Sequence, residues 1–289
     1  MENILEITNL CKEYHDFKLN NVNLTIPKGM IMGLIGENGA GKTTTIRAIL
    51  NLLNNTSGEI KVFGLDIKKN EKQIKEEIGV VLDDSFLSEY LNPNAVNRIM
   101  KNLYKNWNED TYNKYIKEFK LPINKNIKDY SSGMKMKLKL AVALSHNAKL
   151  LILDEPTSGL DPIARNEILD IFQEFIQDEE HSILVSSHIT SDLEHIADYI
   201  TFINNGEIIL SEPKDNLLDN YGIVKCSEES FNKINKNDFI NYRKNKYEYE
   251  MLVENRFDFK KKYDIETIDK PTIEDIMLIY IKGEDRKWI

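Results

Sequence analysis

The segment GENGAGKTT, residues 36–44, decides which fold this chain adopts. It satisfies the pattern G-x-x-x-x-G-K-[ST], a P-loop, and it follows MIMGLIG (30–36), a nearly continuous apolar stretch that predicts a buried strand. The glycines allow the backbone to wrap a triphosphate with its N–H groups inward, Lys42 reaches the β- and γ-phosphates, and the Thr43 hydroxyl ligates Mg²⁺. The predicted nucleotide site consists of Gly36, Asn38, Gly39, Ala40, Gly41, Lys42, Thr43 and Thr44.

Two carboxylates further along the chain complete a phosphate site. In KLLILDEP (149–156), an apolar strand delivers Asp154 to its C-terminal end, where the carboxylate holds Mg²⁺ directly or through water. Glu155 follows and is placed to deprotonate a water for in-line attack on the γ-phosphate. Alone, an Asp-Glu pair at a strand end is more often simply exposed to solvent, whereas beside a P-loop it favours a catalytic role. His188 ends another apolar stretch. It either donates a hydrogen bond to the γ-phosphate or is an ordinary polar residue at a strand end.

Composition limits the classes of partner. The chain has 289 residues, is 41% apolar and carries a net charge of −9, which supports a globular α/β fold and argues against nucleic acid or anionic lipid as the main partner. Cys11 and Cys226 have no CxxC spacing, so neither a disulfide framework nor a zinc site is indicated. With no signal-peptide pattern and no long apolar run, we expect a cytosolic chain that does not itself cross a membrane.

Strand and helix patterns alternate along the first part of the chain, which predicts a largely parallel, helix-covered sheet. From about residue 86, apolar residues recur at helical spacing, and this predicts a helical insert that ends near Pro122. A helix follows Gly133, and another is expected around 164–176. The expected strands are ILEITNL (4–10), LNNVNLTI (19–26), MIMGLIG (30–36), KLLILD (149–154), SILVSSH (182–188) and YITFINNGEIIL (199–210).

After Pro213 the sequence becomes rich in lysine and asparagine, which predicts a separate small α+β domain over 213–289, with a split βαβ arrangement as one option. Lys260–Lys262 are read as a solvated face because acidic residues surround them. The expected strands are YGIVKCS (221–227), DFINYRKN (238–245), YEYEMLV (247–253) and DIETID (264–269), before a last helix, TIEDIMLIYIKG (272–283).

The segment YSSGMKMKLKLAVAL (130–144) predicts a helix with an unfavourable charge pattern. Lys135, Lys137 and Lys139 lie in its opening turns, where the helix dipole is already positive. Hydroxyls and free backbone N–H groups just before them are typical of an anion site at a helix N-terminus. We therefore expect a negative group to compensate the lysines.

With these motifs in this order, residues 1–212 resemble the nucleotide-binding subunit of an ATP-binding cassette (ABC) transporter. In the terms of that family, Walker A is GENGAGKTT, Walker B is LLILDE, the D-loop is SGLD ending at Asp161, the switch histidine is His188, and the signature is YSSGMK in place of LSGGQ. The resemblance implies an α/β fold of the P-loop NTPase cassette type, with a mostly parallel core sheet, N-terminal antiparallel strands and a helical subdomain at about 86–147. The accessory domain 213–289 lies outside it.

The resemblance also implies an ATPase that uses ATP and Mg²⁺, with Lys42, Glu155 and His188 as catalytic residues. In the family, the signature helix of one subunit faces the γ-phosphate bound by another. Ser131 and Gly133, together with Asp161, are therefore expected to contact a nucleotide held by a second ABC ATPase subunit, either an identical chain or a close paralogue. On this view the lysines of the signature helix are compensated only when that nucleotide-loaded partner closes.

Three further positions take their meaning from the resemblance. Tyr14 matches the aromatic residue that stacks on adenine, although an ordinary strand-end tyrosine is the alternative. Ser132 replaces the first glycine of the signature, and we expect activity to survive. Asp83 stands where the family has a glutamine. Its carboxylate can still reach Mg²⁺, but it lacks the amide's donor and brings a charge near the γ-phosphate, so basal turnover is expected to be low.

The resemblance implies a membrane permease as partner, and hence a cytoplasmic protein held peripherally on the cytoplasmic face of the cell membrane. Phe86, Leu87, Tyr90 and Leu91 are expected either to receive a permease helix or to pack within the helical insert. The last helix resembles that of export-type cassettes, so we expect export of a drug, an antibiotic or another small amphipathic compound. The transported compound itself stays open.

Two other classes of function compete. A soluble ABC ATPase with a non-transport role normally carries two cassettes, a long coiled coil or a basic face, and the sequence has none of these. A nucleotide-gated interaction module with a decayed ATPase is opposed by the intact Lys42, Asp154, Glu155 and His188.

Overall fold

A sheet of six strands runs through the first of two units into which the chain divides, Met1–Ser211 and Glu212–Ile289. The protein is represented by a computed structural model, which describes residues 2–54, 56–82, 87–246, 248–264 and 267–285. The strand order is β10-β9-β3-β8-β7-β6, and the pairs from β9 to β6 are parallel. The strands are β3 (Ile31–Ile35), β6 (Ile78–Val81), β7 (Leu150–Asp154), β8 (Ser182–Ser187), β9 (Tyr199–Asn204) and β10 (Glu207–Pro213).

The topology of this sheet positions the candidate site. Strands β3 and β7 both pair with β8, so the segments that follow all three emerge at one edge. Register fixes this neighbourhood, because Ile35 lies opposite Ser187 and Asp154 lies opposite Ser186. Every residue of β3, β7 and β8 is buried, which explains their nearly continuous apolar sequences.

A second sheet of four strands, in the order β2-β1-β4-β5, is antiparallel. Helix α1 (Lys42–Ile49) joins this sheet to the core sheet, because its fully buried Ile46 and Ile49 belong to the same apolar cluster as Ile7 of β1 and Met32 of β3. The strands are β1 (Asn3–Glu13), β2 (Lys18–Pro27), β4 (Ser57–Val62) and β5 (Leu65–Asp66). The expected N-terminal antiparallel strands and the mostly parallel core sheet are confirmed.

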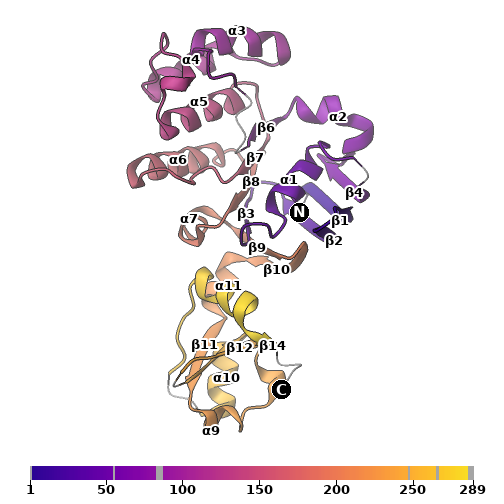
Figure 1. Cartoon of the computed structure of the whole chain (residues 1–289), viewed down its shortest axis with the longest axis vertical. Coiled ribbons are helices and arrows are strands. Elements are labelled where there is room, and N and C mark those ends of the chain that lie inside the picture. The colour runs from indigo at the N-terminus through magenta and orange to yellow at the C-terminus, as the bar shows by residue number, and fades with distance from the viewer. Residues whose placement is uncertain (1, 55, 83–86, 247, 265–266, 286–289) are drawn as a thin grey trace. The chain divides into compact units, whose positions relative to one another are not determined.

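A group of helices forms a subdomain of its own in the first unit (Figure 1). Most residues of the apolar faces predicted from helical spacing, among them Val96, Met100 and Tyr112, meet in one cluster, whereas Ile99 and Leu103 are exposed. Asn92 and Asn108 cap the first two helices by accepting hydrogen bonds from Ala95 N and Thr111 N. These helices are α3 (Pro93–Leu103), α4 (Glu109–Glu118) and α5 (Ser132–Leu144), with a 3₁₀ turn at Ile127–Asp129.

Three more helices complete the first unit: α2 (Ile67–Lys75), α6 (Pro162–Phe175) and α7 (Thr190–Ile196). Asp66 caps α2 and Asp161 caps α6, each through a side-chain oxygen that accepts backbone N–H groups. None of the helices in the described residues combines the length and apolar character that a membrane span needs.

The second unit contains a sheet of four strands in the order β11-β13-β12-β14, with antiparallel pairing throughout. Because β11 and β12 both run antiparallel to the β13 strand between them, they point the same way and form a split βαβ unit with α9. Phe231, Phe239, Tyr242 and Tyr249 fill its core. The elements are α8 (Lys214–Asp219), β11 (Gly222–Cys226), α9 (Glu228–Phe231), a 3₁₀ turn (Lys236–Asp238), β12 (Asn241–Lys244), β13 (Tyr249–Val253), α10 (Arg256–Tyr263), α11 (Ile273–Lys282) and β14 (Glu284–Asp285).

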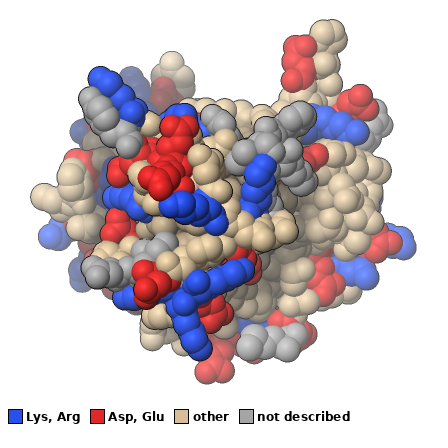
Figure 2. Space-filling model, turned by 90° about the horizontal axis from the view of Figure 1, so that it is seen from below, with Lys and Arg blue, Asp and Glu red and all other residues tan. Residues whose placement is uncertain are grey.

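One expected strand of the second unit is wrong. In the segment 264–269, residues 265–266 lie outside the described part, and the remainder makes only an isolated bridge between Asp269 and Ile223. Before this segment the chain forms helix α10, which was not predicted. Asn255 caps the helix, and its side chain accepts hydrogen bonds from two backbone N–H groups. Lys262 forms an ion pair with Asp238 at 2.7 Å, and on the face shown in Figure 2 basic and acidic side chains lie beside one another. The ion pair of Lys262 favours a solvated face over a binding patch for Lys260–Lys262.

Candidate functional site

The P-loop connects β3 to α1 and depends on glycine at two points. Gly41 has a φ of +117° and caps α1, and a Cβ there would lie 2.9 Å from Leu19 Cδ2. A Cβ at Gly36 would lie 2.4 Å from the carbonyl oxygen of Ile203. The backbone therefore follows a path that other residues cannot adopt without displacing the strands beside it. The loop thereby brings Lys42 to the N-terminus of α1, where a helix favours anions.

Lys42 is buried and directed back toward its own loop. Its Nζ donates hydrogen bonds to the carbonyl oxygens of Gly36 at 2.7 Å and of Glu37 at 3.3 Å. It also lies 3.2 Å from Oε1 of Glu155, which follows the end of β7. The positive charge is thus held at the mouth of the P-loop, within reach of the predicted general base.

Asp154 has both carboxylate oxygens engaged at the end of β7. Its Oδ2 accepts a hydrogen bond from Thr43 Oγ1 at 2.8 Å, and its Oδ1 accepts one from Ser186 Oγ at 2.5 Å. The hydroxyl and the carboxylate are hard oxygen donors side by side, which suits Mg²⁺. Among the residues that the structure describes, no cluster of three or more His, Cys, Asp and Glu side chains could hold a metal, and Mg²⁺ at nucleotide sites typically takes only one or two carboxylates in addition to phosphate oxygens. Thr43 and Asp154 therefore fit the ion.

Glu155 lies between the other two predicted catalytic side chains. Its Oε2 accepts hydrogen bonds from His188 Nδ1 at 2.7 Å and from the His188 backbone N at 3.3 Å. Its Oε1 is buried beside Lys42 and makes no hydrogen bond within the described part of the chain. In this structure Oε1 is closed to solvent and paired with the Lys42 cation, so it becomes available to a bound water only when Lys42 turns away from it.

Ser186 was not predicted from the sequence. Besides donating to Asp154, its hydroxyl accepts a hydrogen bond from the backbone N of Glu155 at 3.1 Å, so one side chain of β8 contacts the carboxylate of Asp154 and the backbone of Glu155. The only signal in the sequence was a serine at the C-terminal end of a strand with an apolar centre, two residues before His188. Such a serine is also common at strand ends without any function.

The signature segment and the D-loop lie on other elements. Ser131 is exposed and caps α5 by accepting a hydrogen bond from Met134 N at 3.3 Å, and Asp161 is exposed and caps α6. Gly133 lies where α5 approaches α6, since a Cβ there would lie 3.2 Å from Ala164 Cβ. In the described residues, neither Ser131 nor Asp161 forms a hydrogen bond with the P-loop, so their predicted contact with nucleotide stays a prediction.

The expectation that a partner's phosphate alone compensates the lysines of α5 is wrong. Lys135 pairs with Glu89 at 2.9 Å, Lys137 pairs with Glu167 at 2.5 Å, and Lys139 donates to the carbonyl oxygen of Leu82. Lys135 and Lys137 of α5 therefore pair with acidic residues that are distant in sequence. The charge pattern is therefore balanced by tertiary contacts within one chain.

The remaining predicted residues divide into three groups. Tyr14 is 44% exposed, with Lys12 Nζ 4.9 Å from the centre of its ring, so one ring face is engaged and adenine stacking stays a prediction. Asp83 and Phe86 lie outside the described residues. Leu87 is buried and Leu91 partly buried in the helical subdomain, which supports packing for these two, whereas Tyr90 is 79% exposed.

Comparison with known proteins identifies the family. A family model described as ABC transporter matches residues 19–158. The lantibiotic transport ATP-binding protein SrtF of Streptococcus pyogenes is 39% identical over 219 residues, covering 73% of this chain and 92% of that protein. The chain belongs to the ABC transporter family.

Other members support the same placement. The bacitracin transport ATP-binding protein BcrA of Bacillus licheniformis is 36% identical over 224 residues, covering 75% of this chain and 72% of that protein. A solved structure of an ATP-binding subunit of an ABC transporter superposes with a TM-score of 0.66 at 27% identity, covering 74% of this chain and 91% of that one. The predicted P-loop NTPase cassette is thus confirmed, and the chain is an ATP-binding subunit of the ABC transporter type.

Proposed function

We propose that this chain hydrolyses ATP with Mg²⁺ and thereby drives a separate membrane permease. The observation that carries the proposal is the position of Glu155, which contacts Lys42 on one side and His188 on the other. A P-loop cation, a carboxylate with a buried oxygen free of hydrogen bonds, and an imidazole donor are the groups that attack by water on a γ-phosphate requires.

Each group has a distinct task in the proposed reaction. Lys42 exchanges its contacts with the P-loop carbonyls for the β- and γ-phosphates, and the backbone N–H groups of residues 39–44 bind the phosphate oxygens. Glu155 accepts the proton of the attacking water through Oε1, while His188 orients the carboxylate and donates toward the γ-phosphate. Mg²⁺, when bound through Thr43 and Asp154, supplies positive charge that offsets the charge on the phosphate oxygens. Asp83 is proposed as a further ligand.

The proposed assembly is a dimer with two nucleotides between the subunits. Ser131, Gly133 and Asp161 then act on the nucleotide of the second subunit, which is an identical chain or a close paralogue. An isologous two-fold arrangement is the simplest one, because each subunit gives and receives the same contacts.

The proposed partner in the membrane is a permease, which would keep the chain on the cytoplasmic face. The relatives are named for lantibiotic and bacitracin transport, and this supports an antibiotic or another small amphipathic compound as cargo, moved outward. Tyr90 is the proposed contact on the helical subdomain, because it alone of the three described candidates is exposed. A groove of about 250 Å³ lined mainly by apolar side chains, including Leu52, Val80 and Leu82, offers a second surface for the same permease helix.

Phosphate release from the purified chain tests the activity. We expect release that requires Mg²⁺, stops on chelation with EDTA, and falls by at least about 100-fold in Glu155→Gln, because general-base catalysis contributes that much. Glu118→Gln is the matched control, since Glu118 lies on α4 and pairs only with Lys114 at 3.7 Å among its ion-pair partners in the described chain. Equal release from wild type and Glu155→Gln would refute the assignment of the base, and no release above background from wild type would refute the ATPase.

A further inference from the structure

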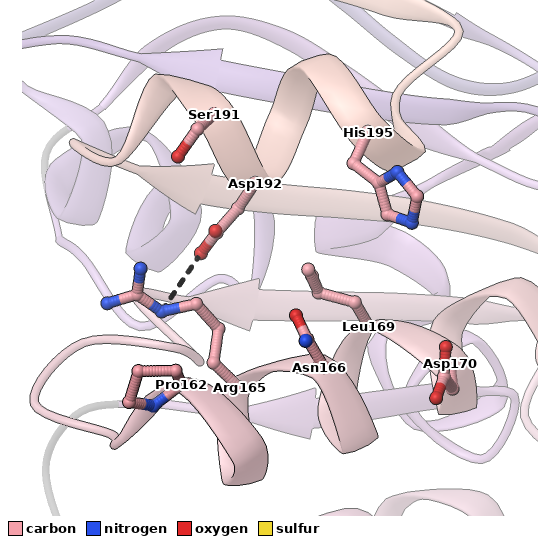
Figure 3. Close-up of a pocket in the computed structure, with 8 residues that line it drawn as sticks. All are labelled: Pro162, Arg165, Asn166, Leu169, Asp170, Ser191, Asp192 and His195. Atoms are coloured by element: carbon pink, nitrogen blue, oxygen red, sulfur yellow. Dashed lines mark ion pairs between the residues drawn. The ribbon is translucent and has the colours of Figure 1, made fainter.

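A groove of about 560 Å³ separates α6 from α7. Figure 3 shows Arg165 of α6 and Asp192 of α7 pointing toward each other at one end of the groove, while Asp170 lies further along α6. Neither member of this pair belongs to a motif that recognises nucleotide. The question is what a charged pair does between these two helices.

Asp192 is buried, Arg165 is 30% exposed, and the pair is incompletely satisfied. Arg165 Nε lies 3.9 Å from Asp192 Oδ2, and the side chain of Asp192 is only 7% exposed. Both atoms are buried, and neither makes a hydrogen bond in the part of the chain that the structure describes. Charge attraction is therefore the main interaction between them, and removal of the Arg165 charge leaves the Asp192 carboxylate buried without a counter-ion.

Both helices begin next to residues of the proposed machinery. Arg165 lies in the first turn of α6, and its backbone N donates to the carbonyl oxygen of Asp161 at 2.9 Å. Asp192 lies in the first turn of α7, which starts two residues after His188. The turn between β8 and α7, which contains His188, is held by Ser187 Oγ, which accepts a hydrogen bond from Ile189 N at 2.9 Å. A contact between the first turns of α6 and α7 therefore joins the segment of Asp161 to the segment of His188.

We propose that Arg165 and Asp192 are positioning residues that hold α7 against α6 so that His188 stays in hydrogen-bond contact with Glu155. The proposal rests on the proposed function, because it assigns the pair to the geometry of hydrolysis. Arg165 and Asp192 do not contact the nucleotide themselves. Their effect passes through His188 Nδ1, 2.7 Å from Glu155 Oε2, and through the turn that Asp161 caps.

Two substitutions at one position separate charge from packing. Asp192→Asn keeps the shape of the side chain and removes its charge, whereas Asp192→Glu keeps the charge and adds a methylene. If the pair acts by charge, Asp192→Asn lowers kcat on the order of tenfold, as expected for a displaced catalytic group, and Asp192→Glu retains most of the wild-type kcat. The KM for ATP changes by less than about twofold in both, because the P-loop lies on other elements.

Arg165→Met should reproduce Asp192→Asn, and Asp170→Asn is the matched control, because Asp170 is an exposed carboxylate on the same groove. All rates are measured below the lowest unfolding temperature of the set. A normal kcat in Asp192→Asn, with or without a lowered unfolding temperature, would overturn the proposal. If Asp192→Glu lowers kcat and Asp192→Asn does not, the pair acts through packing and not through charge, which would also overturn the proposal. A wild type that releases no phosphate would instead refute the proposed function, and the inference with it.

Discussion

At the scale of single residues, the site is built around a backbone conformation that side chains rarely adopt. Glu155 has a φ of +51°, in the left-handed region. A residue other than glycine held there costs about 1–3 kcal/mol, and here the backbone N of Glu155 is held by Ser186 of the neighbouring strand. The strain is tolerated where it directs the carboxylate between Lys42 and His188.

The motifs predicted the members of this cluster but not its internal contacts. Spacing along the chain identified Lys42, Asp154, Glu155 and His188, and the parallel order of β3, β8 and β7 brings them together. Ser186 was missed because a serine in an apolar strand carries no motif, and its importance depends on register with Asp154. The roles in catalysis stay predictions until the reaction is measured.

The nucleotide base offers a test at the same scale. Tyr14→Leu should weaken ATP binding about 5- to 150-fold, because stacking of a base on an aromatic ring is worth about 1–3 kcal/mol, while Tyr14→Trp should keep wild-type affinity. Calorimetric titration in the Glu155→Gln background avoids hydrolysis during the measurement. Tyr90→Leu is the control, because Tyr90 is another exposed tyrosine. Unchanged affinity in Tyr14→Leu would show that Tyr14 is an ordinary strand-end tyrosine.

At the scale of elements, α5 shows both what sequence patterns predict and where they fail. The helix and its capping serine were predictable, because apolar spacing and the Ser-Ser-Gly start are local signals. The partners of its lysines were not, since Glu89 and Glu167 are distant in sequence. Helix α10 was missed for a different reason. Phe259 is its only buried residue, so its sequence shows no apolar face.

The end of α5 also predicts a dependence of stability on pH. His146 is almost fully buried, stacks on Tyr104 with ring centres 4.0 Å apart, and its ring nitrogens lie 3.0 Å and 3.2 Å from the carbonyl oxygens of Ile78 and Val142. Burial lowers the pKa of His146 more than these carbonyls raise it. The unfolded chain therefore binds the proton at higher pH than the folded chain does, and the folded state loses stability as pH falls below the ordinary value of 6.5.

Thermal unfolding of His146→Gln measures this contribution. Between about pH 8 and about pH 5, the unfolding temperature of the wild type should fall more steeply than that of His146→Gln, which cannot titrate. His15→Gln, at an exposed position, should follow the wild type. Parallel curves for the wild type and His146→Gln would contradict the assignment.

At the scale of the whole molecule, the candidate residues belong to one unit. Met1–Ser211 contains the match to the ABC transporter family model, residues 19–158, and every predicted site residue, whereas Glu212–Ile289 lies outside that match. The fold of the first unit was predictable because a P-loop between a buried strand and a helix restricts the topology. The second unit depends on an aromatic core assembled from short strands, and short strands carry weak patterns.

The proposed dimer implies that catalysis needs two subunits. Within one chain, Lys42, Glu155 and His188 are assembled, whereas Ser131 and Asp161 lie on exposed helix starts without a hydrogen bond to the P-loop in the described residues. A second subunit that presents the same two segments would complete the site, and the isologous arrangement satisfies both sites at once.

Sedimentation of the Glu155→Gln variant with and without Mg-ATP tests this claim most directly. We predict a monomer without nucleotide and a dimer at saturating Mg-ATP, because binding without hydrolysis retains the closed state, and we predict that adding Ser131→Arg to the same variant prevents the dimer. A Glu155→Gln chain that stays monomeric at saturating Mg-ATP, while the wild type splits ATP at a specific rate independent of protein concentration, would contradict the account.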